Sequence, residues 1–357
     1  MDIATLSRLG VKHTQSAVAE TLRIQTGYDM TQPVTFYGIV NERCNVKCRQ
    51  CEYWRLAHYK EEMTIEQWQN ALLSIKEFVG EFSMNFSGGE PYIKKGFLDI
   101  LTFARDNGIH CGVTTNGFCM TPENAAKTVA ARPFNVNMSL DAPNAELHDY
   151  LRGQKGLFDR LCKGIGYLRA EQQKQGVKFP ITIKPTFNRL NFRLMPELVE
   201  LAQQLGATAV NFQPVNLWTP ETYNELWMKE EDYPELERTI DRLSEMQKEG
   251  APIMNSEEVL HLFLPHFQGE KAPKEVMPCR VGLRNFWIDT CGDVKLCNDW
   301  PVIGNIKTQS AREIWYGAKA REIREQTLKC SQLCLITCVS QKTIADKIKM
   351  GLKLLKN

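Results

Sequence analysis

The stretch Val34-Thr-Phe-Tyr-Gly-Ile-Val40 runs directly into the loop Asn41-Glu-Arg-Cys-Asn-Val-Lys-Cys-Arg-Gln-Cys51. The first segment is typical of a buried strand, and the loop spaces Cys44, Cys48 and Cys51 as C-x3-C-x2-C. Three thiolates this close together can hold three corners of a cubane iron–sulfur cluster, which leaves one iron open to a small molecule. Zinc is the alternative, although structural zinc takes four closed ligands, usually in C-x2-C pairs, and no histidine lies inside this loop.

The composition argues against several classes of function. The 357 residues suffice for one large domain and a smaller one. A net charge of +2 gives no basic field of the kind that nucleic-acid binding needs, so no nucleic-acid partner is expected. Twelve cysteines without an evident secretory leader favour a reducing cytoplasm, where clustered cysteines are more often metal ligands than disulfides. No apolar run approaches the ~20 residues that span a bilayer.

Strand and helix signals alternate along the chain. Six βα units in series argue for parallel strands with right-handed crossovers, and six rather than eight suggests an open partial barrel. Periodicity alone does not separate such a barrel from a doubly wound sheet. Strands are expected at 34–40, 83–86, 110–114, 134–140, 181–186 and 209–213, with helices at about 65–75, 97–105, 123–131, 157–169 and 196–205.

Polar motifs follow the expected strands. In parallel α/β folds, ligands bind at the carboxyl edge of the sheet, so these motifs predict a binding site there together with the cysteine loop. They are Ser87-Gly-Gly-Glu-Pro91, Thr114-Thr-Asn-Gly117, Met138-Ser-Leu-Asp-Ala142, Lys184-Pro-Thr-Phe-Asn188 and Phe212-Gln-Pro-Val-Asn216.

The cysteine loop after an apolar strand resembles the radical S-adenosylmethionine (SAM) enzymes. The resemblance implies a six-stranded (β/α)6 partial TIM barrel and a SAM-binding 4Fe–4S cluster on the three cysteines. It also implies reductive cleavage of SAM to a 5′-deoxyadenosyl radical that abstracts a substrate hydrogen. One position departs from the family, because the residue before the third cysteine is usually aromatic and covers the adenine, whereas here it is Gln50. Tyr53 and Trp54 are the candidates to replace that contact.

Two of these motifs supply the first part of the SAM site that the resemblance implies. Gly88 and Gly89 lack a Cβ and so let the backbone approach a ligand closely. Glu90 is expected to accept from the amino group of SAM, with an exposed acid after a turn as the alternative. Asn116 can reach the same pocket, although Asn-Gly is also a common turn dipeptide.

The region after the fourth expected strand supplies the second part. Ser139 and Asp141 resemble residues that meet the carboxylate and ribose of SAM, and a turn-capping role is the alternative for Asp141. Arg152, in His148-Asp-Tyr-Leu-Arg-Gly153, resembles the arginine that pairs with the SAM carboxylate through its planar fork. Lys184 is expected to play a similar part, since buried lysines are rare unless paired.

A second field of cysteines lies in the last third of the chain. Cys279 and Cys297 read C-x12-G-x4-C across an expected hairpin, which resembles the opening motif of SPASM and twitch extensions. The closing half is reduced to C-x3-C-x3-C, which is enough for one auxiliary 4Fe–4S cluster. The alternatives are a second, incomplete cluster or a zinc ion on four cysteines. The expected ligands are Cys279 and Cys297 with two of Cys330, Cys334 and Cys338.

Two residues near this field are candidates for catalysis. Relatives that oxidise peptides can use an Asp directly after the last cysteine of G-x4-C as a base. Here that residue is Asn298, so Asp299 is the candidate base. Cys291 is the candidate hydrogen donor for a non-oxidative outcome, and it is otherwise a free thiol or a further ligand.

The expected function is a radical SAM enzyme that modifies peptides, with flavodoxin or ferredoxin as reductant. A small metabolite such as a sugar or glycan precursor is the competing substrate, and a non-catalytic iron–sulfur regulatory protein is the alternative from another class.

The last expected segment is a basic amphipathic helix that can lie on a membrane, on a partner or on this chain. The expected division is a helical arm at 1–32, the barrel at 33–216, a helical bridge at 217–275, the auxiliary domain at 276–340 and the terminal helix at 341–357.

Overall fold

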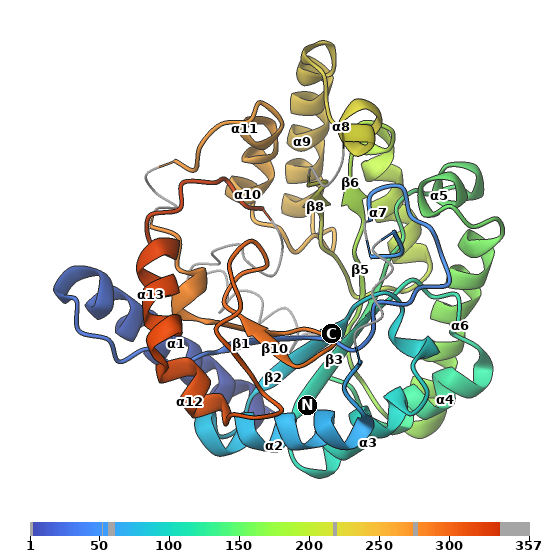
Figure 1. Ribbon diagram of the computed structural model, residues 1–357. Coiled ribbons are helices and arrows are strands. Elements are labelled where there is room, and N and C mark those ends of the chain that lie inside the picture. The colour runs from blue at the N-terminus through green and yellow to red at the C-terminus, as the bar shows by residue number, and fades with distance from the viewer. Residues whose placement is uncertain (1–2, 52, 56–60, 217–219, 274–277, 336–357) are drawn as a thin grey trace.

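The computed structural model describes residues 3–51, 53–55, 61–216, 220–273 and 278–335. The expected terminal helix at 341–357 and Cys338 lie outside these residues. Figure 1 shows helices arranged around a curved central sheet, with the C-terminal α12 (Ala311–Tyr316) and α13 (Ala318–Thr327) on the same side as the N-terminal α1 (Ile3–Thr26). In the described part of the chain, no helix is long and apolar enough to cross a membrane.

The predicted partial barrel is confirmed by the order of its strands. The strands β1, β2, β3, β4, β5 and β7 pair in that order, each parallel to the next. Their bounds are β1 (Thr35–Ile39), β2 (Ser83–Ser87), β3 (His110–Thr115), β4 (Val136–Met138), β5 (Ile181–Ile183) and β7 (Ala209–Val210). The helices that connect and cover them are α2 (Ile65–Val79), α3 (Phe97–Asp106), α4 (Pro122–Ala130), α5 (Ala145–Arg152), α6 (Leu157–Gln175) and α7 (Met195–Gln204), with the short 3-10 helices η1 (Pro91–Ile93) and η2 (Phe192–Leu194).

The fifth and sixth expected strands are each interrupted. The continuation of the fifth is β6 (Thr186–Phe187), and that of the sixth is β8 (Gln213–Pro214). These two short strands pair with each other in a separate parallel sheet. Pro185 stands at the first break, where a residue without an N–H cannot continue the hydrogen-bond ladder.

The expected C-terminal hairpin is present, and it joins the barrel. Its strands β9 (Asn285–Ile288) and β10 (Asp293–Lys295) are antiparallel, and β11 (Gly304–Asn305) pairs with β10. Strand β9 also pairs in parallel with β1. The auxiliary segment therefore extends the barrel sheet, which brings its cysteines to the edge where the first cysteine loop begins. The segment before β9 contains α8 (Pro220–Leu226), η3 (Glu230–Asp232), α9 (Tyr233–Lys248), α10 (Glu257–His261), α11 (Phe263–Phe267) and η5 (Val281–Leu283).

The apolar core lies between the sheet and the helices. On β2, Met84 and Phe86 are buried, and the Phe86 ring meets Trp68 of α2 and Phe97 of α3 edge-on at 5.4 and 5.9 Å. Because successive strand residues point to opposite faces, the alternate residues of β2, including Asn85, point into the barrel. The lumen is therefore polar, in contrast to the packed apolar interior of a closed eight-stranded barrel.

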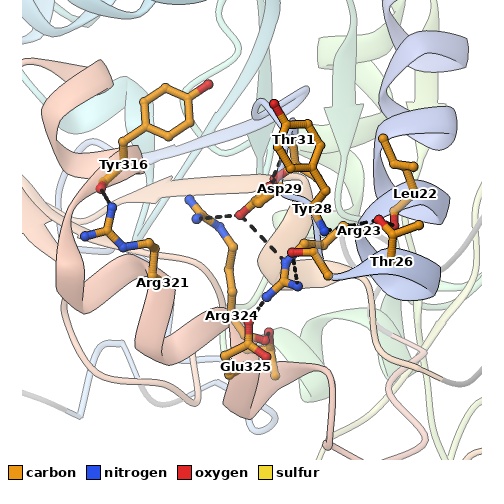
Figure 2. A network of polar contacts seen from close by, with 12 residues as sticks. Leu22, Arg23, Thr26, Tyr28, Asp29, Thr31, Tyr316, Arg321, Arg324 and Glu325 are labelled. Carbon is orange, nitrogen blue, oxygen red and sulfur yellow. Dashed lines mark hydrogen bonds and ion pairs between the residues drawn. The ribbon is translucent and has the colours of Figure 1, made fainter.

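The N-terminal arm is fastened to the auxiliary segment by a buried polar network (Figure 2). The Arg324 side chain is 1% exposed and donates from Nη1 to Asp29 Oδ2 at 3.2 Å. Arg23 forms ion pairs with Glu325 and Asp29. Trp315 donates from Nε1 to the carbonyl of Thr31 at 2.8 Å, so the chain leading into β1 also contacts α12.

Candidate functional site

One cavity of about 650 Å³ opens at the carboxyl edge of the strands. Its volume falls in the range of about 300–1,000 Å³ that ligand pockets usually have. The wall includes both the first cysteine loop and two cysteines of the auxiliary segment, so the two predicted metal sites share one space. The predicted site residues on the wall are Cys44, Cys48, Cys51, Gly88, Gly89, Asn116, Ser139, Arg152, Lys184, Cys297, Asp299 and Cys334.

The cysteines of the first loop converge at one end of this cavity. Cys48 packs on Val46 and Leu157, with Cys44 and Cys51 against the same small cluster. Burial raises the pKa of Cys44 to about 11 and that of Cys48 to about 12, and the neighbouring thiols add to both shifts. Bare thiolates are therefore costly here, whereas bound iron would neutralise them. The donor set fits three corners of a 4Fe–4S cluster.

Two side chains donate hydrogen bonds to these sulfurs. Asn116 donates from Nδ2 to Cys44 Sγ at 3.8 Å, and Arg152 donates from Nη1 to Cys48 Sγ at the same distance. Both were predicted to contact SAM, and both line the cavity. The geometry adds a second role, because hydrogen bonds to cluster sulfurs influence the reduction potential.

Asp141 is engaged by the protein itself. Its fully buried Oδ2 lies 2.7 Å from Arg152 Nε and accepts from Gln50 Nε2 at 2.8 Å. Its Oδ1 accepts from the backbone N–H of Thr186 at 2.7 Å. Within the described structure Asp141 is not part of the cavity wall. These contacts let Asp141 position Arg152 and Gln50, and a contact with SAM stays a prediction.

Glu90 is also engaged by the protein itself. The carboxylate is fully buried, off the cavity wall as far as the chain is described, and burial raises its pKa to about 7. It accepts from Thr115 Oγ1 at 2.8 Å, from the Asn116 N–H at 2.8 Å and from the Tyr92 N–H at 3.1 Å. These hydrogen bonds join the end of β2 to the end of β3. The contact between this carboxylate and the SAM amino group stays a prediction.

The glycines at the end of β2 allow the cysteine loop to pass close by. A Cβ on Gly88, whose φ is 136°, would lie 2.3 Å from the carbonyl of Asn41, and one on Gly89 would lie 1.9 Å from that of Arg43. The Gly89 N–H donates to the Asn41 carbonyl at 2.9 Å. Both glycines line the cavity as well. The space that these two glycines leave is therefore occupied by the backbone of the cysteine loop.

Tyr53 and Trp54, the two candidates for the aromatic contact that Gln50 cannot make, lie in different places. Tyr53 lines the cavity together with Gln50, whereas Trp54 donates from Nε1 to the Cys48 carbonyl at 2.9 Å. Tyr53 is therefore the aromatic side chain that the described loop offers to the cavity.

Four cysteines of the auxiliary segment lie near one another, and Cys297 and Cys334 among them line the cavity. Burial raises the pKa of Cys334 to about 12, and the charges of Cys297, Asp299, Cys279 and Cys330 add to this shift. These four thiols are the candidate ligand set of the auxiliary site.

Of the two candidate catalytic residues, one is on the cavity wall. Asp299 lines the cavity close to Cys334. Cys291 is buried in the turn between β9 and β10, and it is absent from the cavity wall of the described residues. Its backbone N–H donates to Asp289 Oδ1 at 2.8 Å, which fixes the turn.

The residues that the motif analysis missed lie on the strands or directly beside them. The lumen presents amides and a hydroxyl that belong to no motif. The alternation of polar and apolar residues along strands such as β2 is the signal that could have found them. They include Asn85, Asn135, Asn137, Thr182, Asn211 and Asn285.

Comparison with known proteins agrees with this geometry. Residues 39–198 match the model of the radical SAM superfamily, and residues 279–339 match that of the SPASM iron–sulfur cluster-binding domain. The chain is 29% identical over 308 residues to the AdoMet-dependent heme synthase of Methanosarcina barkeri, covering 80% of this chain and 84% of that protein. It is 27% identical over 299 residues to the mycofactocin maturase MftC of Mycolicibacterium smegmatis, covering 82% of this chain and 73% of MftC.

A solved structure has the same fold. The S-adenosylmethionine-bound SuiB of Streptococcus suis matches with a TM-score of 0.65 at 17% identity, over 92% of this chain and 79% of SuiB. The cysteine loop, the parallel strands and the two matched models together identify residues 39–198 as a radical SAM domain and residues 279–339 as a SPASM iron–sulfur cluster-binding domain.

Proposed function

We propose that this protein is a peptide-modifying radical SAM enzyme that abstracts a hydrogen atom from a peptide bound between its two cysteine sites. The observation that carries the proposal is the shared cavity, whose wall includes Cys44, Cys48 and Cys51 at one place and Cys297 and Cys334 at another. A substrate in this space contacts both sites without leaving the protein.

The residues present fit the cofactors that the family implies. Clusters on the two cysteine sets, when bound, supply the electron that cleaves SAM and an acceptor for the electron left on the substrate. The chain's own contribution is to orient the reactants. Ser139 and Lys184 present polar groups to the cavity, and Arg152 brings a positive charge to its wall. Cys279 and Cys330 complete the proposed auxiliary set with the two cysteines on the wall.

The wall offers hydrogen-bonding partners to a peptide. The strands present amides and hydroxyls to the lumen, which can pair with the N–H and C=O groups of a peptide. The similarity to MftC, named as a maturase, supports a peptide substrate. The relative named as a heme synthase makes a tetrapyrrole the competing substrate.

The test is anaerobic reconstitution with iron and sulfide, followed by dithionite and SAM. The expected result is 5′-deoxyadenosine from the wild type and none from a variant with Cys44, Cys48 and Cys51 replaced by alanine. Undiminished SAM cleavage in that variant would end the assignment of the loop. A deuterated peptide library then tests the substrate class, because hydrogen abstraction moves deuterium into 5′-deoxyadenosine. Labelling from a deuterated sugar or tetrapyrrole, with none from peptides, would reject the peptide proposal.

A further inference from the structure

The strand register places a set of uncharged side chains at one level of the lumen. Tyr37 on β1 is in register with Asn85 on β2 and with Trp287 on β9. The Tyr37 and Trp287 rings lie 5.3 Å apart, and all three residues line the cavity. Because residues in register point to the same face of a sheet, this level presents two aromatic faces beside an amide.

A glycine makes room for further amides at the same level. Gly112 on β3 is in register with Asn85. A Cβ on Gly112 would lie 1.9 Å from Asn135 Oδ1 and 3.0 Å from Asn85 Oδ1, so two amide oxygens meet over this glycine. Asn137 donates from Nδ2 to Asn85 Oδ1 at 3.3 Å and to Thr114 Oγ1 at 3.1 Å, which holds the adjoining amides in place.

Two of the amides have an unsatisfied oxygen. Oδ1 of Asn135 and Oδ1 of Asn285 are buried and find no hydrogen-bond partner among the described residues. Asn285 is 1% exposed and lies two positions before Trp287 on β9. A buried acceptor without a donor costs free energy, and such groups in native proteins call for a partner. Both residues line the cavity, so a donor on a bound ligand is a candidate partner for either oxygen.

Most of the charged residues on the described wall lie outside this level. Five of the six charged residues on the described wall follow the ends of their strands or lie on a helix, namely Glu42, Arg152, Lys184, Asp289 and Asp299. The sixth, Lys295, lies on β10 next to Trp287. A carboxylate bound among the amides would lose its hydration against one cation at the side, whereas a neutral polar group exchanges water for amide hydrogen bonds.

We propose that the amide-lined part of the lumen, formed by Asn85 and Asn135 with Tyr37 and Trp287 and by Asn285 two positions before Trp287, is a recognition pocket for an uncharged hydrogen-bonding side chain of the substrate. Such a side chain is the carboxamide of Asn or Gln, or the hydroxyl of Ser or Thr. This inference rests on the proposed peptide substrate, and it adds which kind of residue the substrate presents inside the barrel.

The test is ligand-observed NMR titration of the reconstituted protein with N-acetyl-L-asparagine methylamide. The aspartate and leucine analogues are the matched probes, and D-glucose tests a saccharide source of the same chemistry. The asparagine probe is expected to bind about tenfold more tightly than either analogue. Only its side chain both donates and accepts hydrogen bonds without carrying a charge. Equal binding of all three blocked amino acids overturns the proposal, and so does tighter binding of D-glucose.

Variants locate the binding. Asn285→Leu removes one unsatisfied amide at similar size, and Gly112→Ala drives a methyl group against Asn135 Oδ1. Each is expected to lower the affinity for the asparagine probe about tenfold. Asn70→Leu, which makes the same change on the exposed surface of α2, is expected to leave this affinity unchanged. Thermal unfolding identifies any variant that fails to fold, and the other variant then decides. Wild-type affinity in a folded pocket variant overturns the assignment.

Probe binding is measured without dithionite, so it does not depend on SAM cleavage. If the wild type makes no 5′-deoxyadenosine but binds the asparagine probe, the proposed function fails and the pocket stands. If it cleaves SAM but does not distinguish the probes, the pocket fails and the proposed function stands.

Discussion

Arg152 Nε lies 2.7 Å from Asp141 Oδ2, and both side chains are buried beside the first cysteine loop. Asp141 also accepts from Gln50, and Arg152 also donates to the sulfur of Cys48. One buried ion pair thus connects the end of β4, the residue before the third cysteine and a cluster ligand. Removing one member of such a pair leaves an uncompensated charge in the interior.

Arg152 is expected to act on both the cluster and SAM. Arg152→Ala removes a positive charge next to a thiolate, so the reduction potential of the cluster should fall, as EPR-monitored redox titration would show. SAM affinity should fall about tenfold with the loss of the guanidinium fork. Arg152→Lys keeps the charge without the fork, so it should restore the potential more than the affinity.

The matched control for this charge is Arg238→Ala, which removes an arginine from the exposed face of α9. It should change neither quantity. A cluster potential that is the same in Arg152→Ala and in wild type would show that the contact with Cys48 does not influence the electron that cleaves SAM.

Glu90→Gln should change how stability depends on pH. Burial raises the pKa of Glu90 to about 7 from an ordinary value of 4.5, so this carboxyl takes up a proton on folding between those values. Its contribution to stability is complete below the unfolded pKa and is lost as the pH rises through about 7. Relative to the variant, which is neutral throughout, the wild type should lose up to about 3 kcal/mol between pH 5 and pH 8.

Urea denaturation of the metal-free protein at several pH values measures this difference. Parallel stability curves for the two proteins would mean that the hydrogen bonds from Thr115, Asn116 and Tyr92 keep the carboxylate ionised at a pKa near its ordinary value.

The barrel was predictable because its signals are local. The capping box at Thr64, the strand that precedes Cys44 and the polar motifs after each strand can all be read from a few neighbouring residues, and each falls where it was expected. The pairing of β9 with β1 was not predictable, since it joins segments about 250 residues apart that have no complementary pattern.

The internal partners of the two carboxylates could not be predicted. Glu90 and Asp141 lie in recognisable motifs, but a carboxylate is equally able to bind a ligand or the protein's own donors. Only the fold shows that the donors of Thr115 and Asn116 reach Glu90, and that Arg152 and Gln50 reach Asp141. The lumen amides were missed for the opposite reason, since single asparagines on strands have no motif.

The auxiliary cysteines should hold one cluster. Cys334→Ala should remove about four iron atoms from a total of about eight per chain, because each four-iron cluster needs its full thiolate set. Cys291→Ala should keep all of the iron, since Cys291 lies in the β9–β10 turn and is not among the thiols whose charges act on Cys334. Iron and acid-labile sulfide analysis of both variants measures this. About four iron and one zinc in the wild type would favour a structural zinc site, and loss of iron in Cys291→Ala would make it a ligand.

Asp299 is placed to act after hydrogen abstraction. It lies on the cavity wall close enough to Cys334 to affect the ionisation of that thiol, so a base here would be near both the proposed substrate space and the proposed auxiliary cluster. Removing a proton from the substrate radical makes it easier to oxidise, and the electron can then pass to the nearest acceptor. Asp299→Asn keeps the shape of the side chain but cannot accept the proton.

This variant should therefore make 5′-deoxyadenosine at close to the wild-type rate while forming oxidised product at least about a hundredfold more slowly, the usual contribution of a general base. Asn298→Asp in the same background moves the carboxylate back by one residue, and Asn298 also lines the cavity, so partial rescue would assign the role to the carboxylate itself. Liquid chromatography with mass spectrometry follows both products. Product formation at the wild-type rate in Asp299→Asn would eliminate the base. It would favour a redox-neutral outcome such as epimerisation, in which the substrate radical regains a hydrogen atom from a thiol and no proton has to leave.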